Sequence, residues 1–495
     1  MPTNTSESCK QVGGICGHAG LKPATDWRDR FSTEAASRGD AVMQRMHAIL
    51  AQPGNEGVCS LGPGAPSADF FPFFAAEYTV PSAGFPDDAP ARCTTQLHIG
   101  MKDVSEGVSN YDLSSALQYG VGTGSKQLLG FVKEHVKIFH NPPYLDWDCI
   151  LTTGNTSAMD TVMRIFGQKG VTMVIENHTY PTCFETGLPL GYSFFPAKMD
   201  NEGLLPDELD RDLSSWDEEA RGMKRPTMLY TIPTGQNPSG ATPSADRRRQ
   251  VYAVAQKHDL YILEDDPYYV FQFEQEAGPP GAAPPTTQQY ARSLIPSYLS
   301  MDTDGRVFRM DSFAKTISPG ARVGWVTAAR QVVERVMRVH EVSTQHPSGI
   351  SQIALYRLLH DEWGHDGWTR WMLHICEGYK KRRDVMVGAC EASLPRDVVS
   401  WNAPAAGFFM WLTIDWHKHP QAGTMSTHEI EQVIYDAAIR HQVLVVPGSW
   451  FLVDQGKSGM DTVFFRMTFA APATNAIPNA VKALGDAIRE VFKMG

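Results

Sequence analysis

Lys315 is the first residue whose type and setting suggest chemistry. It lies in the loop Asp311–Arg322, after an apolar run and with few neighbouring charges. Partial burial there would lower the pKa of its amine and supply the neutral form that a Schiff base requires. Ser312 and Arg322 add a hydroxyl and a guanidinium, which a phosphate beside such a lysine would need. Taken alone, Lys315 could equally be a solvated loop lysine.

A carboxylate ends another apolar run. Asp265 follows Tyr261–Glu264, which has the pattern of a buried strand. Because a buried acid is costly unless it is paired, Asp265 needs a cationic partner, and a protonated pyridine nitrogen would be one. Tyr268, three residues later, could present its phenol to an oxygen on the same ring. Taken alone, Asp265 could also be a helix N-cap or a turn residue.

Two polar turns add further donors. Asn237-Pro238 lies in the rigid turn Tyr230–Gly240, where the Asn237 side chain can donate and accept hydrogen bonds. The turn Gly154–Ser157 leads into a helical pattern, so the first N–H groups of that helix would point at an anion. Capping of the helix by its own polar side chains is the alternative, and both can hold.

The elements that must position these residues alternate between short β-rich runs and longer amphipathic stretches. This alternation is typical of a parallel sheet covered by helices on both faces. We expect strands at Met173–Glu176, Met228–Ile232, Tyr261–Glu264, Val307–Asp311 and Val323–Thr327, and helices at Ser157–Phe166, Ser244–His258 and Gln331–His340. The predicted fold class is therefore α/β, with a large, doubly wound, mainly parallel sheet domain.

The last third of the chain has a different pattern. A long helical region, Trp363–Ser393, precedes a closing helix near Ile477–Phe492. Between them stand three strand-like runs, Phe408–Ile414, Val443–Val446 and Val463–Phe469. This order predicts a smaller α+β domain. The Pro/Gly-rich region from Gly62 to Pro90 is too irregular to be a domain of its own, and Ala277–Gln288 is interpreted as a surface insertion.

Composition excludes several classes of protein. The 495 residues carry a formal net charge of −11, which argues against a nucleic acid or an anionic membrane surface as the main partner. No run reaches the ~18 apolar residues of a membrane span, and the N-terminus has no signal-peptide pattern. Eight cysteines without a CxxC pair fit reduced thiols, so the cytoplasm is the expected location. Neither Cys9, Cys16 and His18 nor His360 and His365 form a convincing metal motif, and no metal is expected.

Together the motifs resemble the class I and II aminotransferases, which are pyridoxal 5′-phosphate (PLP) enzymes of fold type I. The order that carries the resemblance is Tyr119, Gly154-Asn155, Tyr180, Asn237-Pro238, Asp265-Asp266-Pro267-Tyr268, Ser312-x-x-Lys315, Arg322 and Arg466. The sequence is most similar to the aromatic amino acid and 2-aminoadipate/kynurenine aminotransferase branch, in Pro72-Phe73, Leu117-Gln118-Tyr119, Glu264–Tyr269, Asp311–Phe313, Ala403–Gly407 and Pro447-Gly448. The resemblance runs from about Trp27 to the end of the chain.

The resemblance implies roles toward the cofactor. Lys315 would form the internal aldimine and shuttle a proton, Asp265 would keep the pyridine nitrogen protonated, and Tyr268 with Asn237 would contact the ring oxygen. Tyr180 would stack on the ring. The phosphate would be bound by Asn155, Thr156, Ser312 and Arg322, together with Tyr119 from the other subunit of a homodimer. The phosphate turn reads Gly154-Asn155-Thr156 where relatives often carry Ser and Gln.

The resemblance also implies the reaction. Arg466, helped by Asn237, would bind the α-carboxylate of the substrate, and Gly64 would lie near its side chain. The implied enzyme moves the amino group of an aromatic, 2-aminoadipate-like or kynurenine-like L-amino acid to a 2-oxo acid by a ping-pong mechanism. Another fold type I reaction, β-elimination or decarboxylation, and a PLP-binding regulator of transcription are the alternatives. The acidic charge and the absence of a helix-turn-helix module before Trp27 count against the regulator.

This reading divides the chain into three parts. Residues 1–95 would form an N-terminal arm and part of the small domain, residues 96–355 the large PLP-binding domain, and residues 356–495 the small C-terminal domain.

Overall fold

A seven-stranded sheet is the centre of the larger part of the molecule. The structure, a computed structural model, describes residues 20–42, 49, 52–54, 58, 61–62, 64–86, 90–274, 284–457 and 459–494. The strand order is β3 (Trp147–Thr152), β11 (Gly324–Ala329), β10 (Val307–Ser312), β9 (Tyr261–Asp265), β8 (Met228–Thr231), β4 (Thr172–Glu176) and β5 (Ser193–Ala197). Only β11 runs against the others, because it pairs antiparallel with both β10 and β3.

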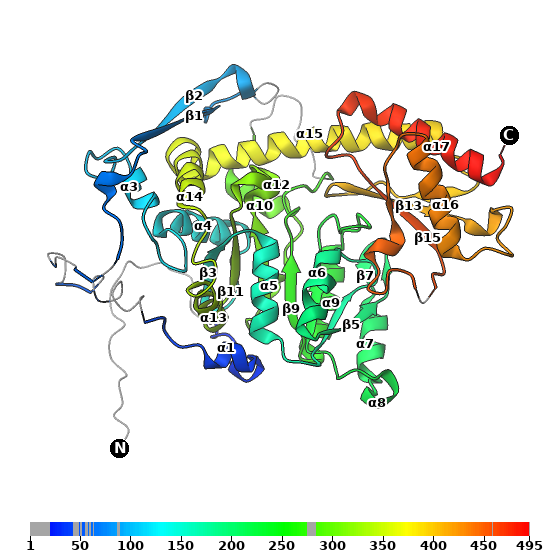
Figure 1. Ribbon diagram of the computed structural model, residues 1–495, viewed down its shortest axis with the longest axis horizontal. Coiled ribbons are helices and arrows are strands. Elements are labelled where there is room, and N and C mark those ends of the chain that lie inside the picture. The colour runs from blue at the N-terminus through cyan, green and yellow to red at the C-terminus, as the bar shows by residue number, and fades with distance from the viewer. Residues whose placement is uncertain are drawn as a thin grey trace.

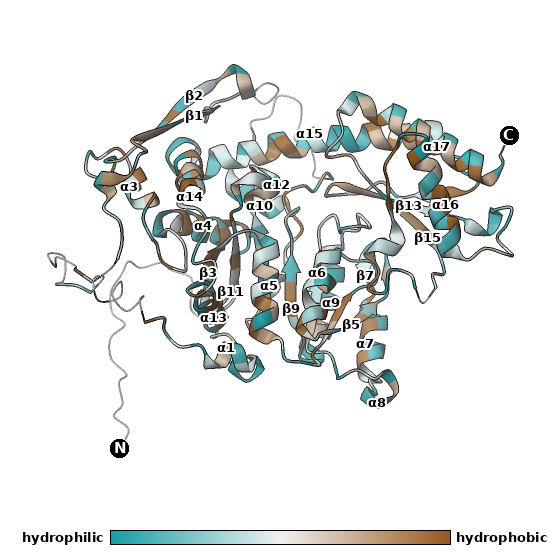
Figure 2. Cartoon of the chain, in the orientation of Figure 1, coloured by the Kyte–Doolittle hydropathy of each residue, from teal (hydrophilic) through white to brown (hydrophobic). Residues whose placement is uncertain are grey.

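Helices cover this sheet, as Figure 1 shows. They include α4 (Lys126–Phe139), α5 (Asn155–Phe166), α9 (Ala245–Lys257) and α13 (Arg330–His340). Every residue of β4, β8, β9, β10 and β11 is buried, which is why these strands are mostly apolar. In Figure 2, β9 is hydrophobic along most of its length and hydrophilic at its C-terminal tip. The predicted α/β class is confirmed, and the five predicted strands match β4, β8, β9, β10 and β11.

A four-stranded antiparallel sheet forms the C-terminal part. Its order is β12 (Val399–Trp401), β13 (Phe409–Ile414), β15 (Val463–Thr468) and β14 (Val446–Pro447). Helix α16 (Thr427–Arg440) packs on β14 and β15, and α17 (Ile477–Phe492) packs on α15 (Gly364–Ser393) and α16. The strand predicted at Val443–Val446 begins only at Val446. Helix α15 runs from α14 (Gly349–Tyr356) to α17 and so spans the two sheets in Figure 1.

The N-terminal region contributes a hairpin that the sequence did not predict. Strands β1 (Ala75–Pro81) and β2 (Thr94–Gly100) pair only with each other. The hairpin packs on η6 (Arg357–Trp363), a π-helical segment, where the indole of Trp363 donates to the carbonyl of Pro81 at 2.8 Å. Residues 275–283 of the predicted insertion lie outside the described residues; residues 284–286 lead into α10 (Thr287–Ser293).

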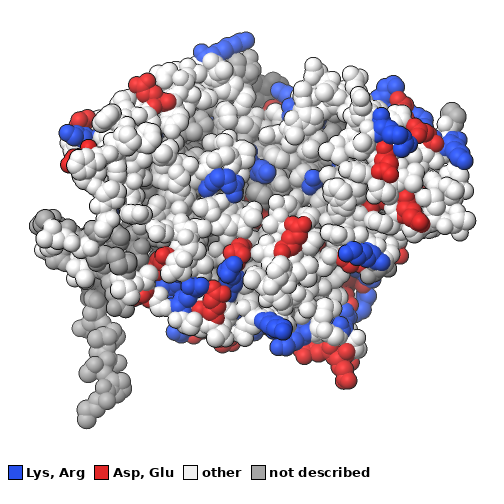
Figure 3. Space-filling view, in the orientation of Figure 1, with Lys and Arg blue, Asp and Glu red and all other residues white. Residues whose placement is uncertain are grey.

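Acidic and basic side chains are interspersed over the face seen in Figure 3. Among the described helices, none is both long and apolar enough to cross a membrane.

Candidate active site

The polar residues singled out in the sequence follow the carboxyl ends of β3, β4, β8, β9 and β10. Because these strands are parallel, their carboxyl ends share one edge of the sheet, where ligands bind in open α/β folds. The register pairs Met310 of β10 with Asp265 of β9, so the loop that carries Lys315 starts beside Asp265.

Asp265 is a buried carboxyl group held by two neutral donors. The amide of Asn155 donates to Oδ1 at 2.7 Å and the hydroxyl of Tyr230 donates to Oδ2 at 2.7 Å. Burial raises the pKa of Asp265, while these hydrogen bonds and the charge of Lys315 oppose the rise. Neutral donors alone do not compensate a buried negative charge, so this carboxylate is suited to a cationic partner in the adjoining space.

Lys315 lies on α12 (Phe313–Thr316), directly after β10. The hydroxyl of Ser312 caps this short helix by accepting the N–H of Ala314 at 3.0 Å. Burial lowers the pKa of the Lys315 amine, the nearby charge of Arg322 lowers it further, and the charge of Asp265 acts in the opposite direction. A larger share of neutral amine is therefore present near neutral pH, as nucleophilic and proton-transfer chemistry requires.

An anion cradle lies at the N-terminus of α5. Gly154 precedes this helix with φ +98° and no side chain caps it, so its first N–H groups lack a side-chain acceptor. Arg322 is held beside them by donating to the carbonyls of Thr153 at 2.9 Å and Pro319 at 3.2 Å. A Cβ at position 154 would lie 2.8 Å from the guanidinium, so glycine is required here. The buried Ser312 adds a hydroxyl. These groups suit a phosphate.

The side chain of Asn155 is not directed at the cradle. Its Nδ2 donates to Asp265 and to the carbonyl of Met310, at 2.7 and 3.1 Å. Its Oδ1 is buried and has no hydrogen-bond partner in the described part of the chain. Asn155 therefore supports the buried carboxylate, and only its backbone N–H is placed for a phosphate. Thr156, the second residue of α5, is exposed.

Arg466 forms a second cationic centre, on β15. Its Nη1 donates to Oδ1 of the buried Asn237 at 2.7 Å. Its guanidinium carbon lies 4.5 Å from the ring centre of Phe409 and 4.9 Å from that of Phe451. The Nε atom is buried without a partner among the described residues, and burial lowers the pKa of the group. An unpaired buried N–H beside a positive charge suits an anionic ligand such as a carboxylate.

Two tyrosines lie between these centres. Tyr268 is buried and packs edge-on against Phe408 and Phe409, with ring centres 5.2 and 5.7 Å away. Burial raises the pKa of Tyr268, so its phenol remains a hydrogen-bond donor at neutral pH. Tyr180 is half-buried, precedes α6 (Pro181–Gly187), and lies near enough to affect the pKa values of Tyr268 and Arg466.

Tyr119 and Gly64 lie apart from this group within the single chain. Tyr119 is 63% exposed and lines a surface pocket of about 580 Å³ with Pro66 and His346, and this pocket includes neither Lys315 nor Asp265 nor Arg466. Gly64 is exposed, and a Cβ built on it meets no described atom within 4 Å.

Sequence reasoning missed two residues of the site and gave a third only a general role. Tyr230 and Phe451 were given no role, although Tyr230 stands in the turn Tyr230–Gly240. Phe409 belongs to the aromatic run Phe408–Trp411, which the sequence offers as a candidate for substrate choice. The signal for Tyr230 was a polar hydroxyl on an otherwise apolar strand next to β9. Phe451 offered no signal, because its approach to Arg466 depends on how η8 (Gly448–Phe451) packs on β15.

Comparison with known proteins identifies the family of the chain. The model of the family "Aminotransferase class I and II" matches residues 133–484. The chain belongs to the class I and II aminotransferases. An aromatic amino acid aminotransferase of Schizosaccharomyces pombe is 39% identical over 94% of this chain and 98% of its own length. The kynurenine/α-aminoadipate aminotransferase of Bos taurus is 30% identical over 93% of this chain and 99% of its own.

A solved structure agrees with these relatives. The aminotransferase Aro8 from Candida albicans superposes with a TM-score of 0.87 and is 33% identical, covering 96% of this chain and 100% of its own. The resemblance and fold type I expected from the sequence are confirmed. The chain is an aminotransferase of the class I and II family, and its cofactor is PLP.

The described residues fit that cofactor. PLP has a pyridine nitrogen that can carry a proton, a phosphate dianion and an aldehyde. The aminotransferase offers a buried carboxylate held only by neutral donors, an uncapped helix N-terminus with an adjacent arginine, and an amine of lowered pKa. Each of these groups matches one part of the cofactor in charge and chemistry.

Proposed function

We propose that this aminotransferase moves the amino group of an aromatic L-amino acid, or of a kynurenine-like or 2-aminoadipate-like one, to a 2-oxo acid in a ping-pong cycle. The observation that carries the proposal is a pair of centres: Asp265 with Lys315 at the carboxyl ends of β9 and β10, and Arg466 of the four-stranded sheet, which has an unpaired buried Nε and bonds to Asn237 in the loop after β8. The printed names of the relatives from Schizosaccharomyces pombe and Bos taurus support the choice of substrates.

We assign the cofactor contacts by this geometry and by the family. PLP, when bound, supplies the electron sink that allows a bond at the substrate Cα to break. Asp265 keeps the pyridine nitrogen protonated, and Asn155 and Tyr230 hold that carboxylate in place. Lys315 holds the cofactor and moves a proton at the substrate Cα. Tyr268 and Asn237 donate to the ring oxygen, and Tyr180 covers the ring. The phosphate contacts are assigned to Thr156, Ser312, Arg322 and the backbone N–H of Asn155.

The substrate contacts centre on Arg466. Asn237 occupies Nη1 and leaves the Nε–Nη2 edge for the α-carboxylate. The rings of Phe409 and Phe451 fix the plane of the guanidinium and add flat apolar surface, which supports aromatic side chains as substrates. Gly64 remains a proposed neighbour of the substrate side chain.

We also propose a homodimer with shared sites, in which Tyr119 reaches the partner's phosphate. Large exposed apolar side chains support this, among them those of Phe70, Phe74 and Tyr119. Size-exclusion chromatography showing an active monomer would contradict the dimer.

The division of the chain at residues 95/96 and 355/356 is likewise a proposal. The packing of the β1–β2 hairpin on η6 supports grouping the N-terminal arm with the C-terminal segment. Because these boundaries lie within β2 and near the end of α14, hydrogen exchange is the test: a β1–β2 hairpin that opens independently of η6 would contradict the division.

A cytoplasmic location is proposed from the cysteines. All five described ones, Cys93, Cys149, Cys183, Cys376 and Cys390, are free thiols. Fractionation that recovers the enzyme with an organelle would contradict this location.

The experiment for the main proposal is a matrix of amino donors against 2-oxo acceptors. We expect phenylalanine, tyrosine or tryptophan to exchange with 2-oxoglutarate, so that glutamate and the aryl 2-oxo acid appear in equal amounts. Pyruvate with ammonia, or carbon dioxide, formed without any acceptor would indicate β-elimination or decarboxylation instead. Exchange confined to other amino acids would refute the aromatic substrate.

A further inference from the structure

We propose that Gln236 is a positioning residue that, by bonding to Glu176, fixes the Asn237 loop against the Tyr180 loop and so sets the affinity of Arg466 for the substrate carboxylate. This inference rests on the proposed roles of Asn237, Tyr180 and Arg466. It concerns a buried amide–carboxylate pair, Gln236 and Glu176, neither of which is among the residues assigned above to the cofactor or the substrate.

The side chain of Gln236 uses its whole hydrogen-bonding capacity. It is 1% exposed. Its Nε2 donates to Oε2 of Glu176 at 2.9 Å and to the carbonyl of His178 at 2.7 Å. Its Oε1 accepts the N–H of Ser239 at 2.8 Å and the hydroxyl of Ser239 at 2.7 Å. An amide has two donors and two acceptor sites, so all four are filled and its orientation is fixed.

Glu176 anchors this amide to the sheet. It is the last residue of β4 and is buried. Besides Gln236, it accepts the hydroxyl of Thr231 at 2.7 Å and the N–H of Ile232 at 3.3 Å. Burial raises the pKa of Glu176 to about 7, and these donors act against that rise. Among the described residues, the hydrogen bonds to this carboxyl group come from Thr231 at the end of β8, from Ile232, which follows it, and from Gln236.

The pair connects both sides of the site. Asn237, the next residue after Gln236, holds Nη1 of Arg466. His178, whose carbonyl accepts from Gln236, stands two residues before Tyr180. A single amide therefore ties the substrate loop to the loop that precedes α6. If this amide is lost, the positions of Asn237 and Arg466 relative to Tyr180 are no longer fixed. A substrate whose carboxylate binds Arg466 while its reacting atoms lie beside the cofactor ring requires these positions.

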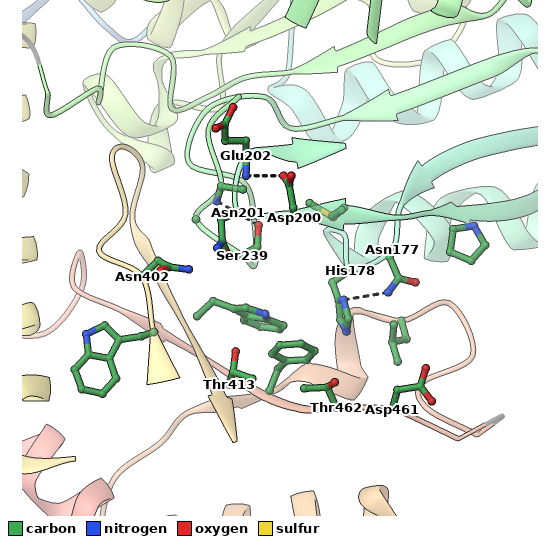
Figure 4. A pocket seen from close by; sticks show the side chains of 18 of the residues that line it. Asn177, His178, Asp200, Asn201, Glu202, Ser239, Asn402, Thr413, Asp461 and Thr462 are labelled. Carbon is green, nitrogen blue, oxygen red and sulfur yellow. Dashed lines mark hydrogen bonds between the residues drawn. The ribbon is translucent and has the colours of Figure 1, made fainter. Parts of the chain in front are cut away.

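A neighbouring cavity explains why the pair must be complete. A cavity of about 1000 Å³ lies between the large sheet and the four-stranded sheet, lined by His178, Ser239, Trp411 and Phe464. Figure 4 shows His178 and Ser239 on neighbouring loops around it. Gln236 bonds to both residues from the buried side and is itself not among the lining residues. An incomplete pair would admit water from this cavity toward Arg466.

The test exchanges the amide and the carboxylate. Gln236→Glu removes both N–H donors of the amide and places a second carboxyl group against Glu176, so the bond to the His178 carbonyl is lost and at most one shared proton joins the two carboxyl groups. In the double variant Gln236→Glu/Glu176→Gln, the amide at 176 donates to the carboxylate at 236, and Ser239 keeps its acceptor. Only the bond to the His178 carbonyl is lost. Tyr252→Phe is the matched control, because it removes a hydroxyl that donates to the buried Asp302 at 2.9 Å, away from the site.

The main readout is binding of 3-phenylpropionate, an unreactive carboxylate, by calorimetry on the PLP-loaded enzyme, with 3-phenylpropionamide as the uncharged comparison. We expect Gln236→Glu to weaken 3-phenylpropionate and to raise KM at least tenfold, with a smaller change in kcat. The double variant restores the bond to residue 176 but not the bond to the His178 carbonyl, so it should recover part of this tenfold loss. Tyr252→Phe should lower Tm and leave binding unchanged.

Three results would overturn the inference: unchanged binding in Gln236→Glu, no recovery in the double variant, or equal weakening in Tyr252→Phe at equal loss of Tm. The proposed function fails separately, if the wild type catalyses no amino transfer. Because binding is measured without turnover, the two failures are distinguishable.

Discussion

Replacement of Arg466 probes the substrate site most sharply. Arg466→Met removes the guanidinium that Asn237, Phe409 and Phe451 hold in place, while leaving a side chain of similar length. Arg466→Lys keeps the charge but loses the planar pair of donors. Neither variant touches Lys315 or Asp265, so cofactor binding should persist in both.

The magnitude follows from the environment of the guanidinium. Its Nη1 is occupied by Asn237, so a carboxylate would form two charge-assisted bonds with the remaining edge, in a buried site where Nε has no other described partner. Removing one partner of a buried ion pair costs about 3–5 kcal/mol, so Arg466→Met should lower kcat/KM by roughly 10²- to 10⁴-fold. Losing the fork alone costs about 1.5–3 kcal/mol, so Arg466→Lys should lower kcat/KM by roughly 10- to 100-fold.

The assay is single-turnover amino transfer from phenylalanine and, in parallel, from 2-phenylethylamine, which has no carboxylate. Only the reaction of phenylalanine should be slowed by either variant. Arg489→Met is the control, because this α17 arginine donates to the Ser393 carbonyl at 2.9 Å and has no place in the site. Equal loss for both donors, or a wild-type rate with phenylalanine in Arg466→Met, would refute the assignment.

Three further predictions follow from the same geometry. Asp265→Asn should lower kcat at least about 100-fold with the cofactor still bound, because a neutral amide cannot hold the pyridine nitrogen protonated. Stopped-flow absorbance measures the rate, and a rate equal to that of the wild type would contradict the role of Asp265. The pKa of Lys315 is lowered in the folded apoenzyme, so the unfolded chain binds more protons than the folded one as pH rises toward 10.5, the pKa of an unfolded lysine. The free energy of unfolding of the wild type, relative to that of Lys315→Met, should therefore increase with pH up to that value. Urea unfolding that shows no such increase would count against the lowered pKa. Mixing inactive Tyr119→Ala and Lys315→Ala homodimers should regain activity if Tyr119 serves the partner's site, since one site of each mixed dimer is then intact; no regain after verified subunit exchange would reject that role.

The site could be predicted where the chemistry stands at the end of an apolar strand. Asp265 and Lys315 each follow a buried run, and parallel strands bring such ends to one edge, so their proximity follows from the strand pattern. Arg466 could be predicted as well, because a guanidinium on an apolar strand needs an anion.

The missed elements share a physical cause. The strands β3 and β5 are the two outermost strands of the large sheet. Their residues are incompletely buried, so the apolar run is broken, and β5 also contains Pro196. The hairpin β1–β2 is mostly exposed, and its buried apolar face is limited to Leu97 and Ile99 of β2, which is too short a pattern to indicate a strand. The orientation of Asn155 depends on the carbonyl of Met310, which only the assembled sheet places within reach.

Activity and absorbance of Lys315→Ala test the central claim most directly. The wild type, loaded with PLP, should exchange the amino groups of an aromatic amino acid and 2-oxoglutarate, and should show the visible absorbance of the lysine-bound cofactor. In Lys315→Ala, both the turnover and that absorbance should be lost, while Tm stays near the wild-type value because the lysine is only partly buried. A Lys315→Ala enzyme that keeps its colour and its rate would contradict the account.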